Sequence, residues 1–373
     1  MYTNAPSLSS LCYIYSMREL RQKIGQMIMI GLQGEELSQE EKRLVKNFSF
    51  GGFILFSHNL KEPKQILSLC GSLWKLNQTP PLIAIDQEGG RVHRLPPPFT
   101  HFPPAAVLGR TGNAGLAYKA GLATARELSA VGINLNFAPV LDVHSNPNNP
   151  VIGDRALSSE PEQVTQLGWS MIQGLRAGGV IPCAKHFPGH GDTAQDSHLE
   201  LPVVKKDRAA LKSLELPPFI HTCRNQVESL MTAHVLYPSF DSDHPATLSY
   251  AIVANLLRHE IDYEGVVFSD DLEMKAISQN YSLENAVSLA IQAGIDVLLF
   301  CHQKETAVTA FEFLYREAEK KEIKTRVEES CERVQKLKRR FLKSFTGAHP
   351  GAVEDSISLL DHRKIVDEIH GSL

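Results

Sequence analysis

The sequence predicts an α/β protein built as a single (β/α)8 TIM-like barrel. Short apolar runs alternate with longer amphipathic stretches over most of the chain, and 373 residues suit one barrel domain. This alternation predicts parallel strands joined by crossover helices, and about eight strands fit a closed barrel better than an open doubly wound sheet. An open sheet would need a glycine-rich phosphate turn after its first strand, and Gly31-Leu32-Gln33-Gly34 is too sparse for that.

The apolar runs give the expected strands. They are Gln26–Ile30, Gly52–Phe56, Leu82–Ile85, Leu135–Val140, Ile181–Ala184, Leu230–Ala233, Gly265–Ser269 and Val297–Phe300. Helical patterns between them predict helices at Pro63–Leu76, Ala114–Val131, Pro161–Ala177, Ser249–His259 and Leu283–Ala293. A charged helical pattern follows from Lys304 to Leu342, and we expect its basic stretch at 336–340 to be a solvated face, because several glutamates precede it.

We expect the catalytic barrel to span residues 17–345. Residues 1–16 read as a poorly ordered extension, because serines interrupt their apolar stretch and no Lys or Arg precedes it, unlike a signal peptide. Residues 346–373 contain Gly, His and Pro before a short amphipathic stretch, and we expect a C-terminal tail or a packing helix there.

Composition limits the partners that this protein can have. A hydrophobic fraction of 43% is typical of a globular protein, and a net charge of −4 offers no basic field for nucleic acid. No apolar run reaches the roughly 18 residues of a membrane span. The 6 cysteines are scattered, which favours free thiols in a reducing, cytosolic setting. We expect a monomer that acts on a small molecule, with no nucleic-acid or membrane partner.

Polar residues gather just after the predicted strands, where the loops of a barrel meet on one rim. Four segments carry them: Asp86–Arg91 continuing to Arg94, Gly153-Asp154-Arg155, Lys185–Thr193 continuing to Asp196-Ser197-His198, and Phe268-Ser269-Asp270-Asp271.

The third of these segments holds one Lys, three His and two Asp within 14 residues. Pro188, Gly189 and Gly191 interrupt it, so we expect neither a regular helix nor a central strand there. A long polar loop after a buried strand is typical of a functional site. A metal site is the alternative, but the spacing lacks the one-face arrangement of a zinc protease helix, and we expect no metal and no cofactor.

Asp270 follows an apolar run that we expect to end at Ser269, which places its carboxylate on the rim. The competing interpretation is a cap for the following helix, since Asp is a favoured N-cap residue. Asp271 can fill that role and leave Asp270 for chemistry. Taken alone, this segment supports capping and catalysis equally.

Together, these segments resemble glycoside hydrolase family three, in its single-domain bacterial β-N-acetylglucosaminidase branch, the β-hexosaminidases of peptidoglycan recycling. The run from Lys185 to His198 resembles the signature loop of that branch, and Ser269-Asp270-Asp271-Leu272 with Met274 resembles its nucleophile motif. The first two segments resemble its sugar-binding elements. The resemblance runs in order from about Leu20 to Leu342.

The resemblance implies a role for each candidate residue. Asp270 would attack the anomeric carbon, His198 would act as the acid and base, and Asp196 would orient the imidazole of His198. Five residues would bind the sugar: Asp86, Arg94, Arg155, Lys185 and His186. The alternative for these five is a set of structural ion pairs at the barrel mouth.

The acid and base of a retaining glycosidase must give and then take a proton, and imidazole titrates near neutrality. A carboxylate beside it selects the tautomer and stabilises the charged form. A histidine in this role also removes one negative charge near Asp270, which would ease binding of anionic substrates. Because of Pro188, Gly189 and Gly191, we expect the loop that carries His198 to be mobile and to close on bound sugar, a rigid packed loop being the alternative.

The resemblance thus implies a retaining exo-glycosidase. It would remove terminal non-reducing β-linked N-acetylglucosamine from muropeptide fragments, in which that sugar is joined to an anhydro-muramic unit. Three alternatives stay open: a phosphorylase on the same sugar, a β-glucosidase-type specificity, and a non-catalytic sugar-binding barrel.

Overall fold

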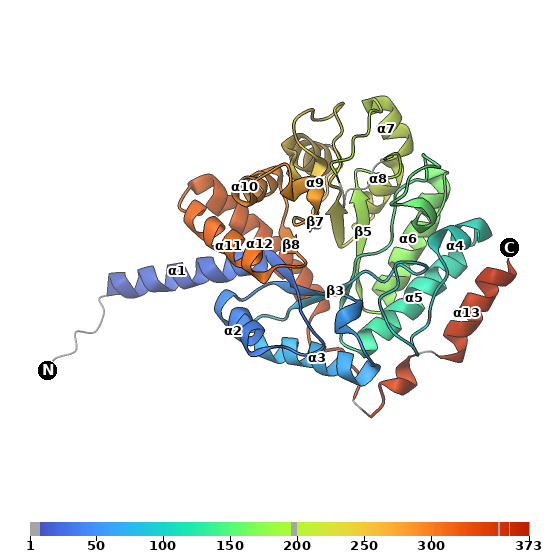
Figure 1. The fold of residues 1–373 in the computed structure, drawn as a ribbon, viewed down its shortest axis with the longest axis horizontal. Helices are drawn as coiled ribbons and strands as arrows, with labels where there is room; N and C mark the ends of the chain where they lie inside the picture. The colour runs from blue at the N-terminus through green and yellow to red at the C-terminus, as the bar shows by residue number, and fades with distance from the viewer. Residues whose placement is uncertain (1–7, 195–199, 350, 358, 373) are drawn as a thin grey trace.

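A computed structural model describes residues 8–194, 200–349, 351–357 and 359–372, and its strands form a closed parallel barrel (Figure 1). The strands are β1 (Ile28–Gly31), β2 (Gly52–Leu55), β3 (Leu82–Ile85), β4 (Leu135–Asn136), β5 (Ile181–Phe187), β6 (Ser229–Thr232), β7 (Val266–Asp271) and β8 (Val297–Phe300). Each strand pairs with the next in parallel, and β8 closes the ring on β1. The predicted fold class is therefore confirmed.

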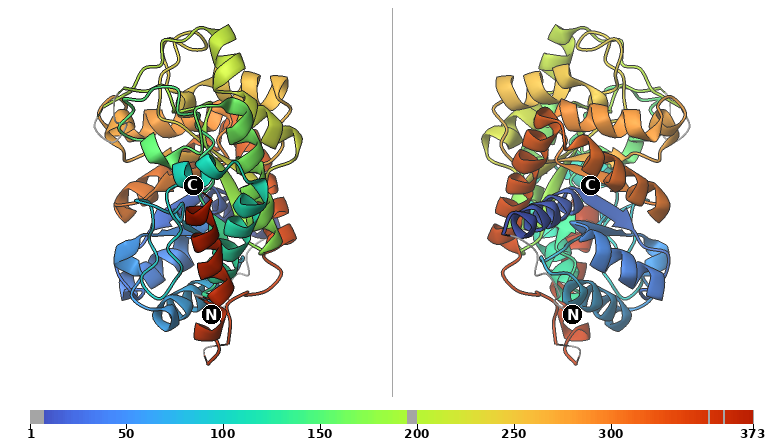
Figure 2. Two further views of the ribbon diagram at one scale, coloured as in Figure 1. Left: turned by 90° about the vertical axis from the view of Figure 1, so that its right-hand side faces the viewer. Right: turned by 90° about the vertical axis from the view of Figure 1, so that its left-hand side faces the viewer.

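Helices surround the barrel and cover the outer face of the strands (Figure 2). The α-helices are α1 (Leu8–Gln26), α2 (Gln39–Phe48), α3 (Pro63–Leu76), α4 (Ala105–Thr111), α5 (Ala114–Ala130), α6 (Pro161–Ala177), α7 (Arg208–Leu214), α8 (Pro217–Arg224), α9 (Lys275–Ser278), α10 (Leu283–Ala293), α11 (Lys304–Glu317), α12 (Lys321–Phe341) and α13 (Leu360–Gly371). A π-helix, η4 (Ala251–Glu260), replaces the predicted helix at 249–259, and 3-10 turns include η2 (Gly153–Arg155). Helices α3, α6 and α10 have their predicted bounds.

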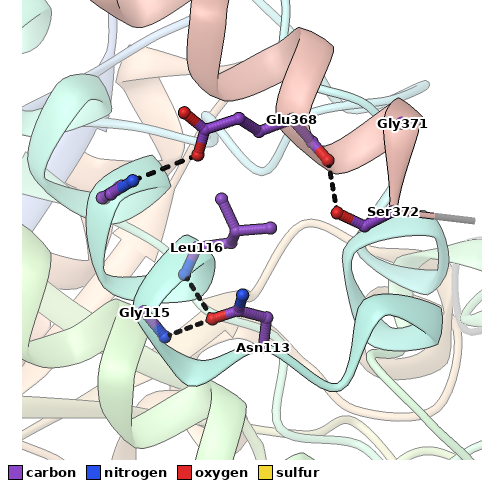
Figure 3. A pocket seen from close by; sticks show the side chains of 7 residues that line it. Asn113, Gly115, Leu116, Glu368, Gly371 and Ser372 are labelled. Atoms are coloured by element: carbon purple, nitrogen blue, oxygen red, sulfur yellow. Dashed lines mark hydrogen bonds and ion pairs between the residues drawn. The ribbon is translucent and has the colours of Figure 1, made fainter.

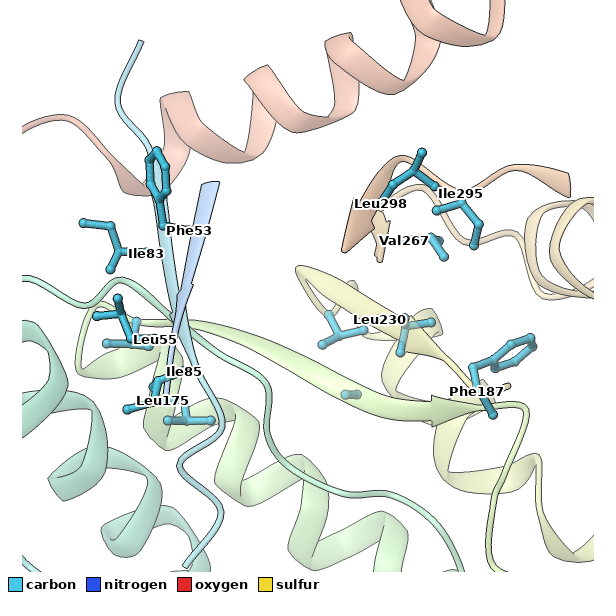
Figure 4. Close-up of a cluster of buried hydrophobic side chains, with 14 of the residues drawn as sticks. Phe53, Leu55, Ile83, Ile85, Leu175, Phe187, Leu230, Val267, Ile295 and Leu298 are labelled. Atoms are coloured by element: carbon cyan, nitrogen blue, oxygen red, sulfur yellow. The ribbon is translucent and has the colours of Figure 1, made fainter. Parts of the chain in front are cut away.

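The two faces of each strand point into different parts of the core, as the twofold alternation of a strand requires. Met29, Ile54 and Phe268 point into the barrel, where the rings of Phe137 and Phe268 meet edge to face at 5.4 Å. The alternate residues pack outward against the helices, among them Phe53, Leu55, Ile83 and Ile85 (Figure 4). This packing fixes the strand ends that carry the polar rim residues.

Helix α12 packs against the amino-terminal end of the barrel. Lys338 is buried and donates to Oε1 of Gln26 at 2.6 Å and to the carbonyl of Gly51 at 2.7 Å. The expected solvated face is therefore wrong at Lys338, where burial lowers the pKa to about 7, although Arg339 and Arg340 are exposed. The sequence did not reveal the burial of Lys338, because this lysine lies on the apolar face of an otherwise charged helix.

A helix near each end of the chain lies outside the ring of strands. Helix α1 begins at Leu8, so it crosses the boundary predicted at Met17, and α13 packs against α4 and α5 (Figures 1 and 2). The limits 1–16, 17–345 and 346–373 stay predictions. Cys70, Cys183, Cys223, Cys301 and Cys331 are free and buried. In the described ranges, no helix has the length and apolar character of a membrane span.

Candidate active site

A cavity of about 270 Å³ lies at the carboxyl end of the strands, where barrel enzymes place their chemistry. Its lining includes six residues that the sequence singled out in four separate segments: Asp86, Arg94, Arg155, Lys185, His186 and Asp270. The fold thus brings these six together. The two remaining candidates, Asp196 and His198, lie outside the described residues.

Lys185 is the centre of a buried charge cluster. Its Nζ lies 2.7 Å from Oδ1 of Asp86 and 2.6 Å from Oε1 of Glu88, and its side chain is almost fully buried. Arg155 donates one hydrogen bond of 2.8 Å to each carboxylate oxygen of the same Glu88. Burial alone would lower the pKa of Lys185, but Asp86 and Glu88 outweigh it and raise that pKa. The ammonium is therefore charged before any substrate arrives.

Glu88 is a site residue to which the sequence assigned no role. Burial would raise the pKa of its carboxyl, but Arg155 and Lys185 hold it well below its ordinary value. Glu88, in the loop after β3, thus pairs with two cations, one on β5 and one in the η2 turn. Its place two residues after Asp86 was the available signal, because an acid at a strand end of a barrel faces the rim.

Asp142 is a second carboxylate that the sequence analysis missed. It is fully buried, and its Oδ2 lies 2.7 Å from Nδ1 of His186. Its Oδ1 accepts the backbone N–H groups of His186 at 3.2 Å and His190 at 2.7 Å. Burial would raise the pKa of Asp142, but His186 and His190 outweigh it and lower that pKa. The ionised carboxylate therefore accepts a hydrogen bond from Nδ1–H of His186, which leaves Nε2 of the ring for a ligand.

Lys185 and His186 lie on β5, because the strand continues to Phe187 instead of ending at Ala184. The expectation of a loop from Lys185 was therefore wrong for three residues. Backbone pairing continues there: Lys185 donates to the carbonyl of Pro139 at 3.2 Å, and Phe187 pairs with Thr232 after a register shift. Pro188 then ends the strand, since it has no N–H to donate.

Asp270 also lies on a strand, since β7 runs on to Asp271 beyond the predicted end at Ser269. Its side chain is half-buried, and Oδ1 accepts the N–H of Asp271 at 2.8 Å. Burial would raise the pKa of Asp270, but His234, His186, that N–H and Lys185 together lower it. The carboxylate is consequently ionised at neutral pH, as a nucleophile must be.

The capping role considered for Asp271 is wrong. Helix α9 begins at Lys275 behind Met274, whose side chain provides no cap. Oδ1 of Asp271 instead accepts the N–H groups of Glu273 at 3.1 Å and Cys301 at 3.3 Å, which joins β7 to β8. Burial, with the charges of Glu273 and Asp270, raises the pKa of Asp271 to about 7.

The first part of the loop after β5, residues 188–194, is tied closely to its surroundings. Asn149 donates to the carbonyls of His190 at 2.8 Å and Gly191 at 2.9 Å, and Tyr237 donates to that of Gly189 at 2.6 Å. A side chain at Gly191 would lie 1.6 Å from the carbonyl oxygen of Val143. The mobility expected of the segment with His198 stays a prediction, because residues 195–199 are not described.

Arg94 differs from the other cations of the cavity. Its backbone N–H donates to Oε1 of Gln87 at 2.9 Å, and its guanidinium carbon lies 5.9 Å from the ring centre of Phe56. The Nε atom is buried and has no hydrogen-bond partner within the described part of the chain. Buried donors are nearly always paired, so this atom is suited to a ligand oxygen.

No cluster of His, Cys, Asp or Glu that could hold a metal ion occurs among residues 8–194, 200–349, 351–357 and 359–372. The sequence expectation of no metal concerns the whole chain and stays a prediction.

The chain is similar to known proteins over most of its length. The family profile "Glycosyl hydrolase family 3 N terminal domain" matches residues 19–337. A β-hexosaminidase of Alkalilimnicola ehrlichii is 42% identical over 284 residues, which cover 74% of this chain and 81% of that protein.

Solved structures give the same result. A glycoside hydrolase family 3 β-N-acetylglucosaminidase from a Paenibacillus species has a TM-score of 0.89 at 39% identity, over 95% of this chain and 68% of that one. NagZ from Neisseria gonorrhoeae, in complex with N-trifluoroacetyl-D-glucosamine, has a TM-score of 0.77 at 30% identity, over 93% and 97%. This chain belongs to glycosyl hydrolase family 3 and is a glycoside hydrolase.

Proposed function

We propose that this protein is a retaining exo-β-N-acetylglucosaminidase. The observation that carries the proposal is the position of the Asp270 carboxylate, which lines the same cavity as a preformed set of hydrogen-bonding charges. The lowered pKa of Asp270 keeps this carboxylate ionised. Relatives that are named β-hexosaminidase, and a similar structure that holds an N-acylated glucosamine, support the choice of sugar.

In the first step, the carboxylate of Asp270 attacks the anomeric carbon while the bond to the leaving oxygen breaks. His198 gives its proton to that oxygen, and a covalent glycosyl-enzyme results. In the second step, His198 takes a proton from water, whose oxygen attacks the same carbon and releases Asp270. Asp196 orients the imidazole. The roles of His198 and Asp196 rest on the resemblance of their segment to the family signature.

Asp86, Arg94, Arg155, Lys185 and His186 are assigned to sugar binding. Asp86, Arg155, Lys185 and His186 form the ion pairs that the structural alternative requires, whereas Arg94 forms none within the described residues. The same side chains line the cavity, so the two interpretations are compatible. Because the pairs fix the donors in advance, binding a sugar costs little reorganisation. Arg94 is the cation best suited to an additional acceptor, since Lys185 and Arg155 are neutralised by Asp86 and Glu88.

We assign muropeptide fragments as the natural substrate class, with N-acetylglucosamine at the non-reducing end and an anhydro-muramic unit as the leaving group. That leaving group carries a carboxylate, which suits a cavity bordered by Arg94. A cytosolic place in peptidoglycan recycling and a monomeric state complete the proposal, and each of these two is a prediction from the sequence alone.

The direct test is release of nitrophenol from 4-nitrophenyl N-acetyl-β-glucosaminide by the wild type, Asp270→Asn and Asp271→Asn. We expect turnover by the wild type, loss of nearly all turnover in Asp270→Asn, and substantial activity in Asp271→Asn. NMR of the fresh product should show the β anomer, which marks retention. Cleavage of the glucoside alone would overturn the sugar assignment, and a sugar phosphate formed with added phosphate would indicate a phosphorylase. Inactivity on every glycoside would favour a non-catalytic barrel.

A further inference from the structure

The C-terminal helix α13 lies outside the residues that the family profile matches, which end at 337. It packs against α4 and α5, beside the loop of residues 86–104 that joins β3 to α4 (Figures 1 and 2). Ile369 of this helix is buried and, with Gln87 and Glu88 of the loop, lines a small internal cavity of about 20 Å³. The C-terminal helix is thus close to the loop that carries Asp86 and Arg94, two of the proposed sugar-binding residues.

A buried hydrogen-bonded path connects α13 to this loop. Nδ1 of His362 lies 2.8 Å from Oε1 of Glu127 on α5, and both residues are only 2% exposed. Glu127 holds Thr100 of the loop twice, since its Oε1 accepts the hydroxyl at 2.7 Å and its Oε2 accepts the backbone N–H at 2.9 Å. A buried carboxylate needs such donors, so the position of Thr100 depends on the geometry of Glu127.

The path continues from Thr100 to the cavity. The ring of its neighbour His101 stacks on His93 with ring centres 4.0 Å apart. Nδ1 of His93 lies 2.6 Å from Nε2 of Gln87, and Oε1 of Gln87 accepts the backbone N–H of Arg94 at 2.9 Å. A displacement of Thr100 would therefore reach the backbone of Arg94 through packed and hydrogen-bonded groups.

We propose that His362 and Glu127 are positioning residues for sugar binding. They hold the 86–104 loop in place through the hydrogen bonds of Glu127 to Thr100. Neither residue lines the cavity of the active site. The chain thereby uses a helix outside residues 19–337 to fix Arg94. The proposal rests on the proposed function, because occupancy of the site by N-acetylglucosamine is one of its readouts.

The test compares His362→Leu, which removes the donor to Glu127, with His362→Asn, whose amide nitrogen can replace Nδ1. With 4-nitrophenyl N-acetyl-β-glucosaminide we expect KM to rise about fivefold in His362→Leu and kcat to stay within about twofold, since positioning acts on binding. His362→Asn should restore KM. Thr100→Val should match His362→Leu, and the double variant should be no worse than either, because both break one path.

Glu368→Ala is the matched control. Glu368 also joins α13 to α5, through Lys119 at 3.1 Å (Figure 3). This pair is exposed, and within the described residues no hydrogen bond or ion pair links it to the loop. Its KM should equal that of the wild type. A KM that rises equally in Glu368→Ala, or that stays unchanged in a folded His362→Leu, would overturn the proposal.

Hydrogen exchange separates this proposal from the proposed function. Amides of residues 86–104 should exchange faster in His362→Leu than in Glu368→Ala, whatever the enzyme hydrolyses. Unchanged exchange in a folded His362→Leu, with folding checked by circular dichroism, would contradict the proposal. A wild type that is inert on the nitrophenyl sugar but shows the expected exchange would overturn only the assigned activity.

Discussion

The buried carboxylate of Asp142 holds the imidazole of His186 at Nδ1, 2.7 Å away, and fixes the ring with Nε2 as the atom left for the cavity. The same carboxylate accepts two backbone N–H groups from the chain around β5, those of His186 and His190. One side chain therefore sets both the tautomer of His186, which we propose binds the sugar, and the path of the loop that follows it.

Asp142→Asn should impair binding and turnover although it nearly preserves size. The amide oxygen can still accept both backbone N–H groups, but the amide nitrogen would face Nδ1 of His186 and force the proton onto Nε2. We expect kcat/KM to fall roughly 10- to 100-fold, as is usual when the group behind a functional histidine is lost. ¹⁵N NMR of His186 should report the changed tautomer.

Glu260→Gln provides the control for this change. Glu260 pairs with Lys212 at 3.3 Å, but both side chains are about half exposed, so the pair contributes little. Its kcat/KM should stay within about twofold of the wild type. Full activity in Asp142→Asn, or an equal loss in both variants, would contradict the role given to Asp142.

The stability of the protein should depend on the protonation of Asp271. Its pKa of about 7 in the folded state lies above the ordinary value of 3.8, so the folded chain binds this proton more tightly than the unfolded chain. The resulting stabilisation is complete below the unfolded pKa and is lost as the pH rises toward 7. Asp271→Asn keeps the acceptor Oδ1 and should remove this loss. The difference in free energy of unfolding between this variant and the wild type should therefore grow in favour of the variant, by about 1–3 kcal/mol, as the pH rises from 4 to 7.

Asp270→Asn should alter the pH dependence of stability in the opposite direction. The pKa of Asp270 is lowered in the folded state, so its stabilisation is present above the unfolded pKa and is lost as the pH falls through the folded value. Urea unfolding of both variants and the wild type at several pH values checks the pair. Parallel pH profiles for all three proteins would contradict the assigned charges.

Gly191→Ala should destabilise the protein, because the new Cβ would lie 1.6 Å from the carbonyl oxygen of Val143 and the backbone must move. We expect a loss of about 1–3 kcal/mol in the free energy of unfolding. Gly71→Ala in α3 is the control, since its Cβ would meet only Phe345, at 3.8 Å. That variant should be neutral or stabilised by up to about 1 kcal/mol. Equal effects of the two substitutions on urea unfolding would refute the packing argument.

The sequence predicted the barrel well where local chemistry determines an element. Helices α3 and α6 start where expected because a proline stands in their first turn, and α10 starts where Ser282 caps it. Strand β4 is shorter than expected, since Pro139 has no N–H for the ladder. Strands β5 and β7 are longer, because pairing with neighbours outweighs the polarity of Lys185 and Asp270.

The residues that the sequence missed are buried charges whose partners lie far away in the chain. Asp142, Glu88 and Glu127 each look like an ordinary surface acid until the fold brings in His186, Arg155 or His362. No local pattern encodes such pairs, because the free energy of burying a charge depends on the partner that meets it. The rim position of Asp270, in contrast, could be predicted from the single apolar run that it follows.

The residue that carries the covalent intermediate shows whether Asp270 is the nucleophile. With 4-nitrophenyl N-acetyl-β-glucosaminide, His198→Ala should form the glycosyl-enzyme readily, because nitrophenolate needs no acid, and should hydrolyse it slowly without its base. Acid quenching and peptide mass spectrometry should then find one N-acetylglucosaminyl group on Asp270, and none in the double variant with Asp270→Asn. A sugar attached to another residue, or steady turnover by Asp270→Asn, would contradict the assignment of Asp270 as the nucleophile.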